Sequence, residues 1–207
     1  MYKIPYFTED NKQVVLDFMH AHPFITLIAN DGKKSVATQI PVLFAEKDGQ
    51  LYLRGHVMRN TDHHKAILQN PEVLILFTGP HCYVSSSWYT EKMGATWNYQ
   101  TVHVNGTCSL LNDDETIQIL KDLTEKHEQP QAQPLYIDGL PHNYVSSHVK
   151  AIAGLEIKVT DIYPIFKLSQ NRDDESYKNI VKHLLASPDT DAQKIASEMK
   201  IRRPNLF

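Results

Sequence analysis

A series of short β-type segments joined by tight turns is the feature that most constrains the fold of this chain. Apolar and β-branched residues fill segments 24–29, 36–44 and 51–58, and the turn sequences Asn30-Asp31-Gly32 and Asp48-Gly49 separate them. Turns this short join antiparallel neighbours, because a parallel pair needs a crossover of about a dozen residues. The pattern predicts a meander of three strands and argues against a doubly wound α/β sheet.

Helices are expected between groups of strands rather than after every strand. Apolar periodicity and capping residues predict helices over 8–22, 61–69, 112–127 and 173–185, and a shorter helix that follows 187–189. Thr8 is expected to cap the first helix, and Asn60 or Thr61 the second. Asn112 and Glu115 have the spacing of a capping box at the third.

Longer strands are expected in the second half of the chain. They are 73–77, 97–110 and 155–168. Gly79-Pro80 is expected to end the first, with a loop over 81–96 after it, and Tyr163-Pro164 marks an edge position or a bulge in the last. The expected class is mainly β with flanking helices (α+β), an antiparallel barrel or sandwich, with a main domain over 1–170 and a helical tail over 171–207 packed on it.

Composition and charge exclude several classes of protein. The chain has 207 residues, of which 42% are hydrophobic and 22% charged, as in an ordinary soluble domain. Its 21 basic and 24 acidic residues give a net charge of -3, so bulk attraction to nucleic acid is not expected. The longest apolar run, 73–77, is too short to span a bilayer, and residues 1–5 lack the apolar core of a signal peptide. We therefore expect a cytoplasmic protein without a membrane partner, in which Cys82 and Cys108 are reduced thiols in strands.

Standard catalytic and metal motifs are missing. The sequence contains no G-x-G-x-x-G, Walker loop, G-x-S-x-G or H-E-x-x-H. Histidine is abundant, and Asp62-His63-His64 is the densest cluster, but neighbouring helical residues face directions about 100° apart and do not converge on one ion. No metal site is expected, and these histidines are interpreted as a solvated helix start.

The segment 51–61 has the residues of a phosphate site. Strand alternation puts Arg54 and His56 on one face, and Arg59 follows just before a helix N-terminus whose free amides attract anions. Gly55 inside a strand suggests close approach by another group. The alternative is that Arg54 and Arg59 pair with acidic side chains on the surface.

A second group of residues forms an aromatic face. Alternation along the strand over 97–110 puts Trp97, Tyr99, Thr101 and His103 on the same side. A face of aromatic planes with polar tips suits a planar heterocycle. A core or dimer surface with aromatic anchors is the alternative interpretation.

Several motifs together resemble those of the PaiB family, described as FMN-binding negative transcriptional regulators. The matching segments run in order over most of the chain: 36–41, 54–60, 77–89 (F-T-G-P-H-C-Y-V-S-S-S-W-Y), 96–103 (T-W-N-Y-Q-T-V-H) and 166–172 (F-K-L-S-Q-N-R). The resemblance implies the split-barrel fold of flavin-binding proteins. It also implies a homodimer with FMN sites at the interface.

The resemblance also implies roles for individual residues. The positions expected to hold the FMN phosphate are Thr38, Arg54, Gly55, His56, Arg59 and Asn60. Those expected nearer the isoalloxazine ring, in the same subunit or its partner, are Trp88, Trp97 and His103.

Three functions are compatible with these expectations. The family implies a negative transcriptional regulator. Segment 192–203 resembles the first helix of a helix-turn-helix, and the alternative is a helix packed on the barrel with a frayed basic end. A flavin-dependent oxidoreductase that uses a nicotinamide donor is the second function, with His103 as a proton donor near the ring. A barrel that has lost flavin and serves as an interaction module is the third.

Overall fold

The structure is a computed structural model that describes residues 4–207. The first three residues, part of the N-terminal segment inspected for a signal peptide, lie outside the described residues. The helices are α1 (Lys12–Ala21), α2 (Asp62–Gln69), α3 (Asp113–Glu128), α4 (His142–Ala151), α5 (Asp174–Leu185) and α6 (Thr190–Arg202), with short 3-10 turns η1 (Pro5–Phe7), η2 (Ser86–Trp88), η3 (Ile137–Gly139) and η4 (Pro204–Leu206). The strands are β1 (Phe24–Asn30), β2 (Ser35–Pro41), β3 (Leu43–Lys47), β4 (Gln50–Met58), β5 (Glu72–Val84), β6 (Thr96–Leu110) and β7 (Ile152–Lys167).

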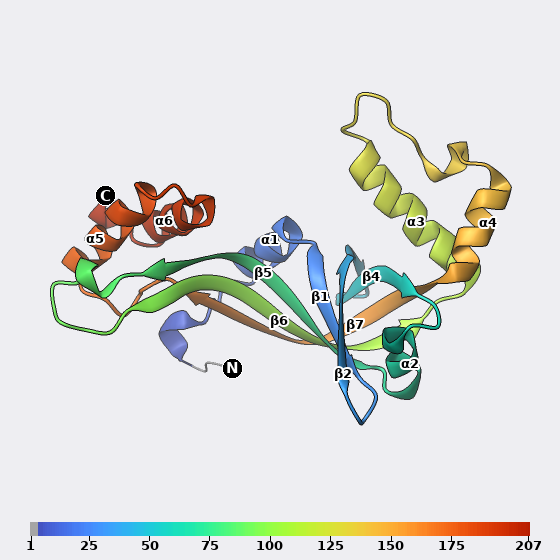
Figure 1. Cartoon of the computed structure of the whole chain (residues 1–207), viewed down its shortest axis with the longest axis horizontal. Helices are drawn as coiled ribbons and strands as arrows, with labels where there is room; N and C mark the ends of the chain where they lie inside the picture. Colours follow the sequence, from blue (N-terminus) through green and yellow to red (C-terminus); the bar gives the residue numbers. More distant parts are fainter. Residues whose placement is uncertain (1–3) are drawn as a thin grey trace. The chain divides into compact units, whose positions relative to one another are not determined.

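All the strands join one seven-stranded sheet in the order β2-β1-β5-β6-β7-β4-β3. β1 pairs antiparallel with β2 and β5, and β4 pairs antiparallel with β3 and β7 (Figure 1). The predicted class, an antiparallel β architecture with flanking helices, is confirmed.

The predicted three-strand meander is wrong in its second strand. Segment 36–44 divides into β2 and β3, which stand at opposite ends of the strand order. The division falls at Pro41, which has no amide hydrogen to continue a ladder. The amide of the next residue, Val42, donates to the Pro23 carbonyl at 2.8 Å, and the Val42 side chain is buried.

Pro80 and Pro164, unlike Pro41, do not end the strands in which they occur. β5 continues through Gly79-Pro80 to Val84, so the predicted break is wrong and the following loop begins later. β1 is in register with β5 only at residues 73–76, and β4 with β7 only at residues 152–158. Pro80 and Pro164 therefore lie beyond these pairings, where a missing amide donor is tolerated. The edge position or bulge expected at Pro164 stays a prediction.

The helix ends follow their capping residues. Thr61 caps α2, accepting from the His64 amide at 3.3 Å, and Asn112 forms the predicted capping box at α3. The first helix begins later than predicted, because Asn11 rather than Thr8 accepts from the amides of its first turn. Helix α4 was not predicted, since its sequence has no side-chain cap and few apolar residues.

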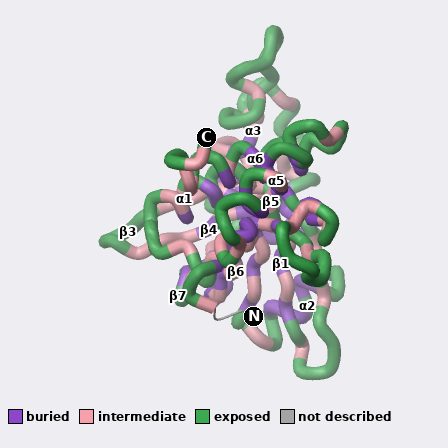
Figure 2. Tube along the Cα trace, turned by 90° about the vertical axis from the view of Figure 1, so that its left-hand side faces the viewer, coloured by how far each residue is buried: buried purple, intermediate pink, exposed green. Residues whose placement is uncertain are grey.

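The described chain divides into two compact units. Of the described residues, unit 1 comprises 4–19, 78–102 and 163–207, and unit 2 comprises 20–77 and 103–162. Side chains such as Phe166, Tyr177 and Ile195 form the core of unit 1, and Leu27, Leu53 and others form that of unit 2. Figure 2 shows buried residues along strands and helices, with exposed turns between them. The domain boundary at residue 170 stays a prediction.

Cys82 and Cys108 are buried free thiols in β5 and β6. Across residues 4–207, no helix has the length and apolarity needed to cross a bilayer.

Candidate functional site

Strand β4 has the alternation that the sequence predicted. Leu53, Gly55 and Val57 are buried, whereas Arg54 and His56 are half-buried on the opposite face. His56 has no hydrogen-bond partner for its buried Nδ1 among the described residues, and burial lowers its pKa.

Arg54 is held by an acidic side chain. Its Nε and Nη2 each lie 2.7 Å from Oε2 of Glu156, on the neighbouring strand β7. Lys47 donates to the same carboxylate at 2.8 Å. Although partial burial opposes ionisation, the two cations hold the pKa of Glu156 below its usual value. The ion-pair alternative left open by the sequence therefore describes Arg54 in this structure.

Arg59 lies in the turn between β4 and α2 and is also partly engaged. Its Nη2 donates to Oδ1 of Asp113 at 3.0 Å, and its Nε donates to the Ile152 carbonyl. The Asp113 carboxylate is largely exposed, and such a pair contributes about 0–1 kcal/mol. An arriving anion can therefore compete for Arg59 at little cost.

Gly55 is approached closely by the protein itself. A Cβ added there would lie 3.0 Å from the Pro41 carbonyl oxygen and 3.2 Å from Cδ1 of Ile40. The space beside Gly55 is thus occupied by the end of β2.

The start of α2 is built by the turn before it. Asn60 has a left-handed backbone, with φ of 64°, and its amide donates to Nδ1 of His64 at 3.3 Å. The Thr61 hydroxyl donates to the Met58 carbonyl at 2.8 Å. The first amides of a helix, here those of Asp62 and His63, have no carbonyl partner within the helix and carry the positive end of its dipole.

A hollow of about 360 Å³ lies at this helix start, lined by residues of β2, β4 and α2 that include Thr38, Thr61 and His63. His63 is only 3% exposed, and its Nδ1 lies 2.9 Å from the Thr38 hydroxyl. Its Nε2 is buried and has no partner in the part of the chain that the structure describes. Burial lowers the pKa of His63, so the neutral ring is favoured.

The burial of His63 overturns the expectation of a solvated helix start. His63 and His64 are both buried, together with Ala66 and Ile67. Residues 63, 66 and 67 share one helical face, and this spacing was the signal that could have placed His63 against the sheet. His63 is the residue of this hollow that sequence reasoning missed.

Four of the eight residues that line the hollow are apolar, and the other four are polar. It combines the helix N-terminus with the hydroxyls of Thr38 and Thr61 and with an imidazole. Asp62 is the acidic member of the lining, and its largely exposed carboxylate pairs with Lys34 at 2.5 Å. Such a set can bind a phosphate group.

The alternation predicted along β6 is confirmed. Asn98, Gln100 and Val102 are buried, whereas Trp97 on the other face is 52% exposed. The rings of His81 and Tyr83 lie 6.1 and 6.0 Å from that of Trp97. A hollow of about 370 Å³ beside them is lined by residues of β5 and β6 that include Gly79, Trp97 and Tyr99.

The other two residues expected near a ring have separate surroundings. Trp88 stacks on His183 of α5, with ring centroids 4.8 Å apart and planes 8° from parallel. His103 is half-buried in the unit 2 portion of β6, and burial lowers its pKa.

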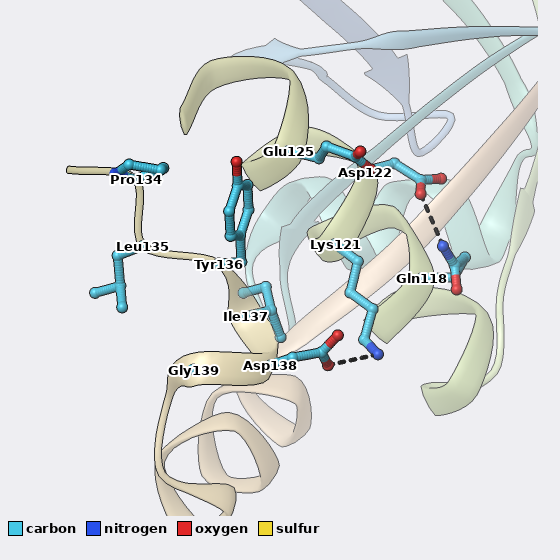
Figure 3. A pocket seen from close by; sticks show the side chains of 10 residues that line it. All are labelled: Gln118, Lys121, Asp122, Glu125, Pro134, Leu135, Tyr136, Ile137, Asp138 and Gly139. Atoms are coloured by element: carbon cyan, nitrogen blue, oxygen red, sulfur yellow. Dashed lines mark hydrogen bonds and ion pairs between the residues drawn. The ribbon is translucent and has the colours of Figure 1, made fainter. Parts of the chain in front are cut away.

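A larger hollow, of about 520 Å³, lies between α3 and the segment before α4 (Figure 3). Lys121 and Asp138 form an ion pair of 2.6 Å in it, and Gln118 donates to Asp122 at 2.7 Å. It contains none of the residues predicted from sequence and no helix N-terminus, so it is a weaker candidate for a phosphate group.

Comparison with known sequences identifies the family. Residues 1–161 match the family described as "Putative FMN-binding domain". The chain is 35% identical over 200 residues to "Protease synthase and sporulation protein PAI 2" of Bacillus subtilis (strain 168), with 97% of each chain covered. The chain belongs to the PaiB family. The family membership that the motifs indicated is thereby confirmed.

Solved structures show the fold of this PaiB-family chain. The FAD and heme binding protein from Mycobacterium smegmatis has a TM-score of 0.58 at 14% identity, over 78% of this chain and 73% of that chain. The flavocytochrome Anf3 from Azotobacter vinelandii has a TM-score of 0.57 at 10% identity, over 80% of this chain and 72% of that chain. The predicted split-barrel fold is confirmed.

The structure brings only some of the predicted positions together. Thr38 lines the hollow at α2, and Arg59 and Asn60 lie in the turn that leads into that helix. Arg54 and Gly55 contact other parts of the protein. Contact of any of these residues with a flavin stays a prediction.

Proposed function

We propose that this protein binds FMN, with the phosphate at the N-terminus of α2. The observation that carries the proposal is His63, a residue that lines the hollow and is buried, hydrogen-bonded to Thr38 and left with an unpartnered Nε2. A buried polar atom without a partner costs about 1–3 kcal/mol, and a phosphate oxygen can supply the missing acceptor. The family description supports FMN, and the names of the two structural neighbours support a flavin.

Several groups of the protein bind the phosphate together. The amides of Asp62 and His63 bind its oxygens, and neutral His63 donates from Nε2 while Nδ1 accepts from Thr38. Arg59 turns from the exposed Asp113 towards the anion and supplies a full positive charge. Bound FMN supplies redox chemistry at its isoalloxazine ring.

The test separates the phosphate from the ring by comparing FMN with riboflavin. His63→Ala is expected to weaken FMN binding by about tenfold or more, since a hydrogen bond to a charged group contributes about 1.5–3 kcal/mol. Thr38→Val should weaken it by less, because Thr38 acts through the orientation of His63. Riboflavin, which lacks the phosphate, should bind to the wild type and to all variants with the same affinity. Exposed His142 provides the matched control, His142→Ala. Flavin fluorescence quenching measures each affinity; equal losses for both ligands, or no loss, would refute this phosphate position.

We propose further that two copies associate through the aromatic face of β6. Trp97 and Tyr83 are half-exposed aromatic residues beside a hollow, the kind of residues that anchor interfaces. Trp97→Ala is expected to convert a dimer into monomers in analytical ultracentrifugation. Tyr144→Ala, a change at an equally exposed aromatic residue of α4, should leave the dimer intact. A wild-type monomer at all concentrations would contradict the dimer itself.

Negative regulation of transcription is the role that family membership suggests, and we propose it as the consequence of FMN binding. Helix α6 buries Ile195 and Met199, and Arg202 at its end pairs with Glu9 at 2.6 Å, so the alternative of a frayed basic end is wrong. DNA contact through this helix would require Arg202 to leave its carboxylate. A mobility shift of duplex DNA that weakens steeply with salt is the expected result. Unchanged mobility at low salt, with and without FMN, would refute direct regulation.

Flavin-dependent oxidoreduction is the second candidate, favoured by His103 on the polar face of β6. NADH or NADPH oxidation in the presence of FMN, reduced in His103→Ala, would support it. Absence of turnover with either donor would exclude a nicotinamide-dependent reaction.

A further inference from the structure

The motif over residues 166–172 has no part in the proposed FMN site, yet it builds a tightly constrained turn after β7. Ser169 has a left-handed backbone with φ of 61°, and its hydroxyl donates to buried Asn98 at 3.0 Å. The Gln170 side chain spans the turn, donating to the Phe166 carbonyl and accepting from the Leu168 amide. The turn presents Lys167 at one end and Arg172 at the other.

Arg172 is a cation without an anionic partner among the described residues. Its guanidinium carbon lies 4.4 Å from the centre of the Tyr89 ring, and Nη1 donates to the thioether of Met93, a weak acceptor. Its Nε is buried and unpartnered among residues 4–207, as is the hydroxyl of Tyr89. Two buried donors in one cluster therefore have no acceptor.

Lys167 adds a second uncompensated charge. Its Nζ donates to the Thr96 hydroxyl and to the Trp97 carbonyl, the latter at 2.8 Å, which are both neutral groups. Burial, and then the charge of nearby Arg172, lower the pKa of Lys167. Within the described residues no carboxylate forms an ion pair with Lys167 or Arg172.

The carboxylates nearest in sequence already have other partners. Asp173 caps α5, accepting from the Ser176 amide at 2.8 Å, and accepts from the Thr90 hydroxyl at 3.2 Å. Asp174 pairs with Arg203 at 3.2 Å. The loop after β5 is tied to the start of α5 by these bonds and by the Thr90 amide, which donates to Ser176 at 2.9 Å (Figure 1). The cluster is thus held in place while its charge is left unbalanced.

We propose that Tyr89, Lys167 and Arg172 form a binding site for an oxyanion such as a phosphate group, made of different residues from the FMN site. Two cations, one of which carries a buried donor, and one buried neutral hydroxyl match the several acceptor oxygens of such a group. Arg172 binds through Nε and an adjacent Nη, Tyr89 through its hydroxyl, and Lys167 as a point charge. This site does not depend on FMN binding.

The test is a titration of the full-length protein with inorganic phosphate at constant ionic strength, followed by the NMR signals of the arginine Nε–H groups. A saturable shift of the Arg172 signal is expected. Arg172→Met and Lys167→Met should each weaken phosphate binding by about tenfold, and Tyr89→Phe, which keeps the ring, by less. Exposed Lys178 on α5 provides the control, since Lys178→Met removes one charge from the same unit without touching the cluster.

The outcomes distinguish this site from the FMN site. Wild-type FMN affinity in Arg172→Met, with phosphate binding lost, supports a separate oxyanion site. Equal loss of phosphate binding in Lys178→Met, or a shift without saturation, overturns the site. Displacement of phosphate from Arg172 by FMN but not by riboflavin would make the cluster the flavin phosphate site and overturn the separation. Thermal melting of each variant identifies any that fails to fold, and Tyr89→Phe then provides the decisive measurement.

Discussion

Ser169 allows the opposing contributions of a strained backbone and a buried hydrogen bond to be measured in one place. Its φ of 61° is disfavoured for any residue with a Cβ, and its hydroxyl donates to Asn98 Oδ1 at 3.0 Å. Ser169 and Asn98 are 3% and 0% exposed, so water does not replace the bond when it is removed. The two contributions respond differently to alanine and to glycine.

The expected magnitudes follow from these two terms. Ser169→Ala keeps the left-handed backbone and leaves the Asn98 oxygen without its donor, which costs about 1–3 kcal/mol. Ser169→Gly loses the same bond but relaxes the left-handed backbone, which recovers about 1 kcal/mol. The free energy of unfolding should therefore fall in the order wild type, glycine variant, alanine variant. In a chain of this size each kcal/mol corresponds to about 2–4 °C in Tm.

Urea denaturation followed by circular dichroism measures these differences. Ser197→Ala on the exposed side of α6 is the control and should change the unfolding free energy by about 0.5 kcal/mol or less. An alanine variant as stable as the glycine variant would refute the contribution of backbone strain. Wild-type stability in both variants would refute the contribution of the buried hydrogen bond.

Three further predictions concern other parts of the protein. Gly79→Ala should destabilise unit 1 by about 1–3 kcal/mol in denaturant titrations, because the new Cβ would lie 2.6 Å from the Phe18 ring. If the variant were as stable as the wild type, the Phe18 ring would be free to move aside. Burial depresses the pKa of His63 below its ordinary 6.5, so the unfolded state binds protons first and the stability of the protein should decline as pH falls below that value. The stability of the His63→Asn variant should decline less over the same pH range, and parallel pH profiles of stability would count against this. Burial raises the pKa of Cys82 and Cys108 to about 12, so both should resist alkylation at pH 8 until the protein is denatured, as mass spectrometry would detect.

Local patterns correctly predicted much of the secondary structure and the faces of the strands. The caps at Thr61 and Asn112 and the alternation along β4 and β6 depend on interactions between residues a few positions apart. The motif series also predicted the family and its fold. These features are determined by the sequence because a capping bond or a two-residue period requires no knowledge of distant segments.

The partners of each strand and of each charged group were decided by the tertiary structure. The transfer of the chain from β2 to β3 at Val42 and the passage of β5 through Pro80 depend on which strands lie alongside. Arg54 pairs with Glu156, which is 102 positions away, and His63 is buried because α2 packs against β1 and β2. The sequence by itself determined which side chains share a face. Only the fold decided what each face meets, because burial and ion pairing depend on contacts between segments far apart in the chain.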